Sequence, residues 1–328
     1  QTGRVGAVEA EFFNGLLDFT CSTCHVAEEH RIAGSRINVT ASDPHGAVTR
    51  GERSERNRST CQSCHGDKPH QGNLLHAGRV NDHTSVLACQ SCHIPAFARG
   101  GVPTKMAWDW SSAGRMDANG KPFQTRNERG QVLYDSRKGS FVLGEDVVPD
   151  YVWFDGRVSY VQPDTVIDPS TRVPINSFHG TPGAADARIW PVKTFHGRQP
   201  FDTEHLTLLV PHTAIPNDTA FWYNFDWAKA LQAGADASGA PYSGKFGFVD
   251  TSMLWPITHM VAPKEQALDC AQCHARQSRL GAVPGIWLTG KHHSPLLDRI
   301  GFGLAGLTLL GVLIHAALRV LSRRRRSH

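Results

Sequence analysis

The stretch CSTCH, residues 21–25, sets the pattern that decides how this chain folds. The same spacing of two cysteines followed directly by a histidine recurs at residues 61–65, 89–93 and 270–274. Two thiols three residues apart on a tight turn can each bond to a vinyl group of one haem, and the adjacent imidazole then lies beneath the iron. The four motifs therefore predict covalently attached haem c.

All eight cysteines of the chain lie in these motifs, so none remains for a disulfide. A single C-x-x-C could also be a redox dithiol or half of a zinc site, but four copies each followed by histidine argue against both. We predict four covalently attached haem c groups, and more if the protein has a further N-terminal half. The predicted attachment residues are Cys21, Cys24, Cys61, Cys64, Cys89, Cys92, Cys270 and Cys273. The predicted proximal iron ligands are His25, His65, His93 and His274.

A low-spin electron-transfer haem needs a second axial ligand, usually a histidine from elsewhere in the chain. The 18 histidines exceed what four bis-histidine haems require, so composition cannot assign the pairs, and any one of the surplus could be a surface residue. A histidine that follows its motif closely cannot easily return to the same iron, so it would serve a neighbouring haem. The predicted distal ligands are His30, His70, His83 and His259, with His45 and His76 in reserve.

The composition allows one large domain or two smaller ones in 328 residues. The 31 glycines and 19 prolines indicate loop-rich structure. Because haem groups would supply much of the core, folding should be coupled to their attachment. We expect a mainly α fold with much irregular structure, a multihaem cytochrome c fold wrapped around stacked haems, plus one C-terminal transmembrane helix.

The segment from Ile300 to Leu318 contains no charged residue and is nineteen residues long, enough to span a bilayer core as a helix. The arginine run at 323–326 marks that end as cytoplasmic, which places the preceding residues in the periplasm. A buried core helix is the alternative. His315 is costly in lipid and should face a partner helix or a cofactor, such as a b-type haem in a neighbouring subunit.

The formal net charge of +4 owes much to that arginine run, and haem propionates would make the body acidic, so no nucleic-acid partner is expected. Residues 1–19 contain no export signal, which suggests that the exported protein is processed or that its beginning lies outside this sequence.

The motifs divide the chain into five segments. They are a three-haem segment at 1–98, a haem-free segment rich in aromatic residues, glycine and proline at 99–250, a fourth haem segment at 251–298, the membrane helix at 299–322 and a basic cytoplasmic tail at 323–328.

Within the haem-free segment, short strands are expected at Tyr151–Phe154 and Val158–Val161. A helix is expected from a cap at Asp218 through Ala233, with Gly234 ending it. The aromatic clusters are expected to pack against haem faces, and the alternative is the wall of a substrate cavity or a docking surface.

The amino-acid sequences in and around several motifs resemble those of the octahaem tetrathionate reductase family of c-type cytochromes. The resemblance covers residues 18 to 285 and is carried by CHVAEEHRIAG, CQSCHGDKPH, HTSVLACQSCHIPAFARGG, TKMAWDWSSAG and THMVAPKEQALDCAQCHARQSRL. It implies a largely helical periplasmic cytochrome with closely packed bis-histidine haems that reduces tetrathionate, with nitrite and hydroxylamine as side substrates. The family has eight haem motifs, and the four present here match its later half. The family's substrate-binding haem, which has a lysine ligand, belongs to the earlier half, so no catalytic residue is assigned here.

Two functions follow from these features. The first is a membrane-anchored module that passes electrons between a quinol-oxidising partner or membrane cytochrome b and a periplasmic acceptor, such as another multihaem chain. The second is a reductase of sulfur or nitrogen oxyanions with a basic cavity, to which Arg99, Arg157, Lys193 and Arg198 would contribute. A subunit of an extracellular cytochrome filament is disfavoured by the anchor.

Overall fold

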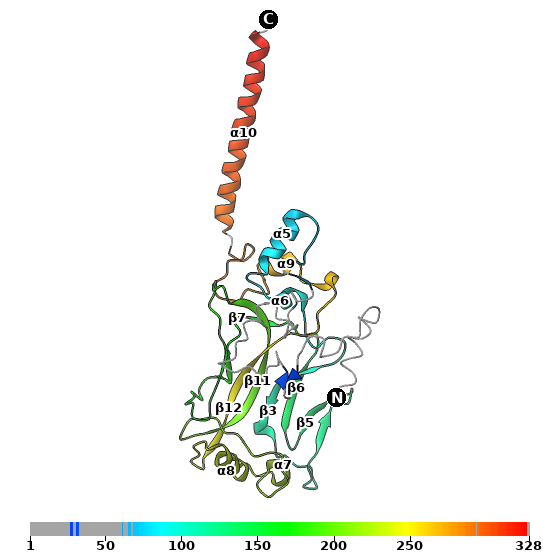
Figure 1. Cartoon of the computed structure of the whole chain (residues 1–328), viewed down its shortest axis with the longest axis vertical. Coiled ribbons are helices and arrows are strands. Elements are labelled where there is room, and N and C mark those ends of the chain that lie inside the picture. The colour runs from blue at the N-terminus through cyan, green and yellow to red at the C-terminus, as the bar shows by residue number, and fades with distance from the viewer. Residues whose placement is uncertain are drawn as a thin grey trace. The chain divides into compact units, whose positions relative to one another are not determined.

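The computed structural model describes residues 27–28, 31–32, 61, 65–66, 68–292 and 294–326, and it separates into two compact units, Gln1–Leu268 and Asp269–His328. Each unit is described by itself. The first is built around an eight-stranded sheet in the order β4-β5-β6-β3-β11-β12-β9, with β7 also paired to β11 (Figure 1). The expectation of a mainly α fold is therefore wrong.

The strands of this sheet are β3 (Thr104–Asp109), β4 (Gln124–Arg126), β5 (Val132–Asp135), β6 (Gly139–Gly144), β7 (Asp150–Phe154), β9 (Val173–Pro174), β11 (Arg188–Asp202) and β12 (Phe246–Pro256). Two small sheets pair β1 (Ala27–Glu28) with β2 (Arg31–Ile32) and β8 (Val158–Tyr160) with β10 (Asn176–Phe178). The short strands expected near residues 151 and 158 are confirmed as β7 and β8.

The sheet is organised around β11 and β12. These two strands run antiparallel from Val192 opposite Pro256 to Asp202 opposite Phe246. β11 also pairs in parallel with β3, where His196 lies opposite Ala107. Several of the aromatic residues that were expected to pack against haem faces lie on strands, such as Trp108 on β3, Trp153 on β7 and Trp190 on β11, and aromatic side chains suit a half-buried pleated surface.

Asp202 is the last residue of β11 and lies opposite Phe246, the first residue of β12. Its fully buried carboxylate accepts hydrogen bonds from the backbone amides of Glu204 and His205, both at 2.8 Å, and from the amide and hydroxyl of Ser243 at 2.5 and 3.0 Å. Burial by itself raises the pKa of Asp202, but these hydrogen bonds together hold that pKa below the ordinary value.

The described helices are short except for the last. They are α5 (Leu74–His83), α6 (Cys89–His93), α7 (Phe221–Asn224), α8 (Trp227–Ser238), α9 (Cys270–Cys273) and α10 (Pro295–Arg326), with 3-10 turns η2 (Trp110–Ser112) and η3 (Lys264–Gln266).

The helix expected from Asp218 to Ala233 is wrong in its bounds. Phe225 adopts a left-handed conformation that separates α7 from α8, and Asp226, not Asp218, caps α8 by accepting from the amide of Lys229. Gly234 lies inside α8, and the helix ends at Gly239. A side chain at Gly234 would collide with the carbonyl oxygen of Val210, so this glycine serves a close approach of two backbones and not a helix end.

Candidate haem-attachment sites

The motif at residues 89–93 forms helix α6, which is fixed to β11 in the first unit. The amide of Ala88 donates to the carbonyl oxygen of Ile189 at 3.0 Å, and the hydroxyl of Ser91 donates to the same oxygen at 2.7 Å. Ala88 also packs in a buried cluster with Phe154, Val158 and Trp190. The core of the sheet unit therefore determines where Cys89, Cys92 and His93 lie.

The segment 262–268 forms hydrogen bonds to the last residues of the same motif. The amide of Leu268 donates to the carbonyl oxygen of Cys92 at 2.9 Å, and the amide of Ala262 donates to that of His93 at 2.8 Å. The side chain of His93 is half-buried, and this burial lowers the pKa of His93. The nearby rings of His70 and His65 lower the pKa of His93 further. His93 is therefore held neutral, which is the form that binds a metal.

The thiols of two different motifs meet in this unit. Cys89 and Cys61 are hydrogen-bonded through their side chains, and this bond lowers the pKa of Cys89 to about 7, against the opposing effect of burial. Both cysteines are half-buried. The first attachment points of the second and third motifs are thus in contact.

The rings of His70 and His93 have centroids 6.1 Å apart and planes 18° from parallel. Two imidazoles bound to opposite sides of one metal ion, each through a bond of about 2 Å, have ring centroids about 6 Å apart. The spacing of these rings therefore fits an iron held between them. Haem c at Cys89 and Cys92 would have His93 as its proximal ligand and His70 as its distal one.

The motif at residues 270–274 lies in the second unit and forms α9. Its turn is closed by a capping box, in which the Asp269 carboxylate accepts from the Gln272 amide and the Gln272 side chain accepts from the Asp269 amide. The exposed ring of His274 has its Nδ1 3.2 Å from the hydroxyl oxygen of Thr289. Burial raises the pKa of the Cys273 thiol, while Cys270 is exposed.

The remaining predicted ligands are placed as follows. His65 is exposed, His83 ends α5 with an exposed side chain, and His259 is exposed with its Nδ1 3.1 Å from the Thr258 hydroxyl. Of these, His65 alone is close enough to affect the pKa of His93. The predicted residues Cys21, Cys24, His25, His30, His45 and Cys64 lie outside the described residues, as does the side chain of His76.

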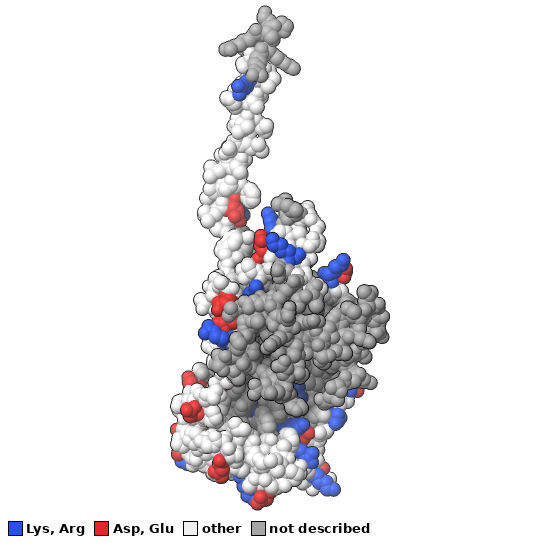
Figure 2. Space-filling model, in the orientation of Figure 1, with Lys and Arg blue, Asp and Glu red and all other residues white. Residues whose placement is uncertain are grey.

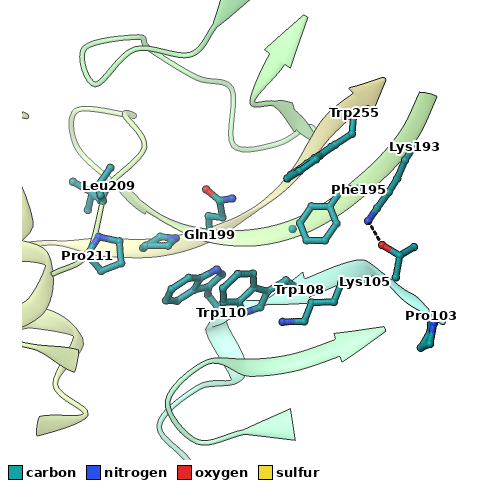
Figure 3. Close-up of a pocket in the computed structure, with 14 residues that line it drawn as sticks. Pro103, Lys105, Trp108, Trp110, Lys193, Phe195, Gln199, Leu209, Pro211 and Trp255 are labelled. Carbon is teal, nitrogen blue, oxygen red and sulfur yellow. Dashed lines mark hydrogen bonds between the residues drawn. The ribbon is translucent and has the colours of Figure 1, made fainter. Parts of the chain in front are cut away.

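The sheet carries a cavity of about 610 Å³ that the sequence does not reveal as a unit. Its aromatic walls are Trp108, Trp110, Phe195 and Trp255, and it is also lined by Lys105 and Lys193 (Figure 3). Among the described residues, no carboxylate lines it.

The two tryptophans at 108 and 110 stack with ring centroids 4.6 Å apart. The Lys105 ammonium lies 3.8 Å from the ring centroid of Phe141, and burial lowers the pKa of Lys105. Lys193 donates to the hydroxyl of Thr104 at 2.7 Å. Two ammonium groups beside an aromatic wall suit an anionic ligand.

The lining of this cavity matches the predicted basic cavity at one of its four predicted residues. Lys193 lines the cavity, but Arg99, Arg157 and Arg198 do not. Arg157 instead pairs with Asp155 at 2.6 Å, and Arg99 donates to the Gln266 side chain at 2.6 Å. Of the predicted haem-attachment residues and iron ligands that the structure describes, none lines the cavity.

Comparison with known proteins gives two matches. Residues 105–277, just over half of the chain, match the family described as "Cytochrome c bacterial". The crystal structure of octaheme cytochrome c from Shewanella oneidensis is similar to this chain with a TM-score of 0.65 and 32% identity, over 81% of this chain and 56% of that one. The chain therefore spans little more than half the length of the octaheme protein. Among curated protein sequences, none matches.

Proposed function

The chain belongs to the bacterial cytochrome c family, and on this premise we propose that it is a membrane-anchored electron-transfer module with four haem groups. It is a multihaem c-type cytochrome similar to octaheme cytochrome c. Tethered haem groups would supply one-electron redox chemistry, and the polypeptide would provide their axial ligands and their surroundings.

The observation that carries the relay proposal is the pair of rings at His70 and His93. The distance between their centroids matches that of two imidazoles bound to one iron. An iron with both axial positions filled by the protein has no open position for a substrate, so its role is to accept and pass on an electron.

The contact between Cys61 and Cys89 supports the same proposal. Haem groups attached at these thiols would approach one another at their thioether edges, because each sulfur is bonded directly to its own macrocycle. Such an arrangement favours transfer between the haems of the second and third motifs over transfer through solvent.

Helix α10 supports a membrane anchor. An 18-residue window within its segment Pro295–Ser322 has a mean hydropathy of 2.0, and the segment exposes every side chain, including large ones such as Phe302 and Leu307. Figure 2 shows a long run of uncharged side chains along this helix. We propose that α10 crosses the cytoplasmic membrane with its arginine end in the cytoplasm and the haem-bearing units in the periplasm.

The anchor suggests the class of electron donor. Tethering beside the membrane makes an encounter with a membrane donor effectively intramolecular, so a quinol-oxidising protein or a membrane cytochrome b is the proposed partner. The proposed acceptor is a periplasmic redox protein or another multihaem chain.

The cavity in the sheet favours a second function. Its two ammonium groups, with no carboxylate among the described lining residues, suit an oxyanion such as tetrathionate or nitrite. A reductase related to the octahaem tetrathionate reductases, with hydroxylamine as a further substrate, would need such a site. None of the predicted iron ligands that the structure describes lines the cavity, so a reductase would need a catalytic haem for which this part of the chain shows no ligand. Relay is therefore the preferred function.

Spectroscopy and reoxidation kinetics of the haem-loaded full chain in detergent separate the two functions. The relay proposal predicts that every ferric haem is low-spin and that neither tetrathionate nor nitrite reoxidises the reduced protein. A high-spin signal that shifts with either anion, accompanied by reoxidation that is lost in the Lys105→Gln, Lys193→Gln double variant, would establish the reductase.

A further inference from the structure

Asn81, in the last turn of α5, holds His70 through its backbone and its ring together. The Asn81 Nδ2 donates to the carbonyl oxygen of His70 at 3.1 Å, and the Asn81 Oδ1 accepts from the amide of His70 at 3.1 Å. The same Oδ1 lies 2.9 Å from the ring Nδ1 of His70. Three contacts from one side chain fix both the position and the rotation of this histidine.

These contacts also determine which ring nitrogen carries the proton. The two backbone hydrogen bonds set the orientation of the Asn81 amide, because its NH2 group must face a carbonyl and its oxygen must face an amide N–H. The atom facing the ring is therefore an oxygen, which can only accept. His70 must then carry its proton on Nδ1, and its Nε2 keeps the lone pair that a metal needs.

We propose that Asn81 is a positioning residue for haem ligation, which keeps the Nε2 lone pair of His70 directed at the iron shared with His93. The inference rests on the proposed assignment of His70 as the distal ligand. A hydrogen bond accepted from the second nitrogen of an iron-bound imidazole orients the ring and makes it a stronger electron donor to the metal. Asn81 would thereby tune the reduction potential of this one haem.

Asn81 also sets the angle between the two ring planes. The rings lie 18° from parallel, and His70 is prevented from rotating because its Nδ1 is bonded to a side chain that is itself fixed to the backbone. The angle between axial imidazole planes governs the anisotropy of a ferric low-spin EPR signal, so the restraint has a spectroscopic signature.

The test compares Asn81→Ala and Asn81→Asp in the haem-loaded full chain by EPR-monitored redox titration. Asn81→Asp, with a stronger acceptor, is expected to lower the potential of one haem, and Asn81→Ala is expected to raise the same potential and change the anisotropy of that haem's signal. Displacement of His70 by cyanide should occur at a concentration about 10–100-fold lower in Asn81→Ala than in the wild type.

Asn73→Ala is the matched control, since Asn73 borders the start of α5 and makes none of the three contacts with His70. It should leave all haem potentials and signals unchanged. If both Asn81 variants behave like this control while His70→Met changes one haem, the positioning role is wrong and the axial assignment stands. If His70→Met also changes no haem, the proposed assignment of His70 itself is wrong.

Discussion

The segments Cys89–His93 and Cys270–His274 carry the same attachment sequence, but their surroundings support them differently. α6 is joined to the core of the sheet unit by hydrogen bonds to Ile189 and by the packing of Ala88. α9 contains no buried residue and is closed by its own capping box. The motif thus specifies the attachment chemistry, whereas the surrounding polypeptide decides how firmly the attachment point is held.

The difference indicates where each haem site obtains its stability. The position of α6 is set by hydrogen bonds to β11 and by the buried cluster that contains Ala88, so disruption of that cluster should disturb this haem. The position of α9 is set by its local cap and by the hydrogen bond from the amide of Arg279 to the carbonyl oxygen of Gln272, and covalent attachment of haem would add to it, since binding of a cofactor contributes directly to folding. Variants that weaken one support and spare the other test this difference.

The largest effect is expected for Phe154→Ala. Phe154 lies in the buried cluster that contains Ala88, the residue before α6. Removing a buried phenylalanine ring lowers the free energy of unfolding by about 3–5 kcal/mol. We also expect the circular dichroism of the haem absorption band to change, because the support of Cys89 and Cys92 loosens. Denaturant titration of the haem-loaded protein measures both quantities.

Trp287→Ala is the control for this loss of an aromatic ring, because Trp287 is 68% exposed in the unit that contains α9. Its effect on unfolding should stay within about 0.5 kcal/mol. Equal losses of unfolding free energy in Phe154→Ala and Trp287→Ala would show that α6 does not depend on the buried cluster.

Asp202→Ala should weaken the sheet without touching a haem. Removing this buried acceptor leaves several amide donors unsatisfied and is expected to cost ~1–3 kcal/mol at pH 7. Because the folded pKa of Asp202 lies below its unfolded value, its contribution is full above the ordinary pKa of 3.8 and is lost as the pH falls through the folded pKa.

The stability difference between wild type and Asp202→Ala should therefore shrink on acidification, as measured by denaturant titrations at several pH values. Asp168→Ala, at an exposed carboxylate, is the control and should show little difference at pH 7. A difference that grows toward low pH would contradict the assigned direction of the Asp202 pKa.

Ser91→Ala tests the hydrogen bond between α6 and β11. The loss of one buried hydroxyl bond to Ile189 should cost about 1 kcal/mol. Ser85→Ala, which removes an exposed hydroxyl bonded to Asp82, is the control and should have a smaller effect. Thermal unfolding of the three proteins makes the comparison, and indistinguishable midpoints would argue against this anchor.

The smallest effect is expected for Gln272→Ala, which opens the capping box of α9. The cost should be ~0.5 kcal/mol, confined to faster hydrogen exchange in residues 270–274, with the haem content unchanged. Global destabilisation as large as that of Ser91→Ala would show that α9 has support beyond its cap.

The haem chemistry could be predicted from the sequence because its determinant is local. Two thiols and a histidine within five residues form one motif, whatever surrounds it. His70 could be ranked among the distal candidates, but its partner could not, because composition gives no distance between rings.

The sheet could not be predicted because its pairing is not local. β11 and β12 meet across more than forty intervening residues, and proline and glycine in both strands resemble loop signals. The role of Asn81 depends on a hydrogen-bond geometry eleven residues from His70, for which no sequence pattern exists. The cavity likewise gathers lysines from β3 and β11, which become neighbours when the sheet forms.

The most direct test of the central claim is anomalous X-ray scattering at the iron edge from crystals of the haem-loaded chain. The account predicts an iron peak midway between the rings of His70 and His93, bonded to both and set in a haem attached at Cys89 and Cys92. An iron beside His93 with its other side bound to a different residue, or left open, would contradict it.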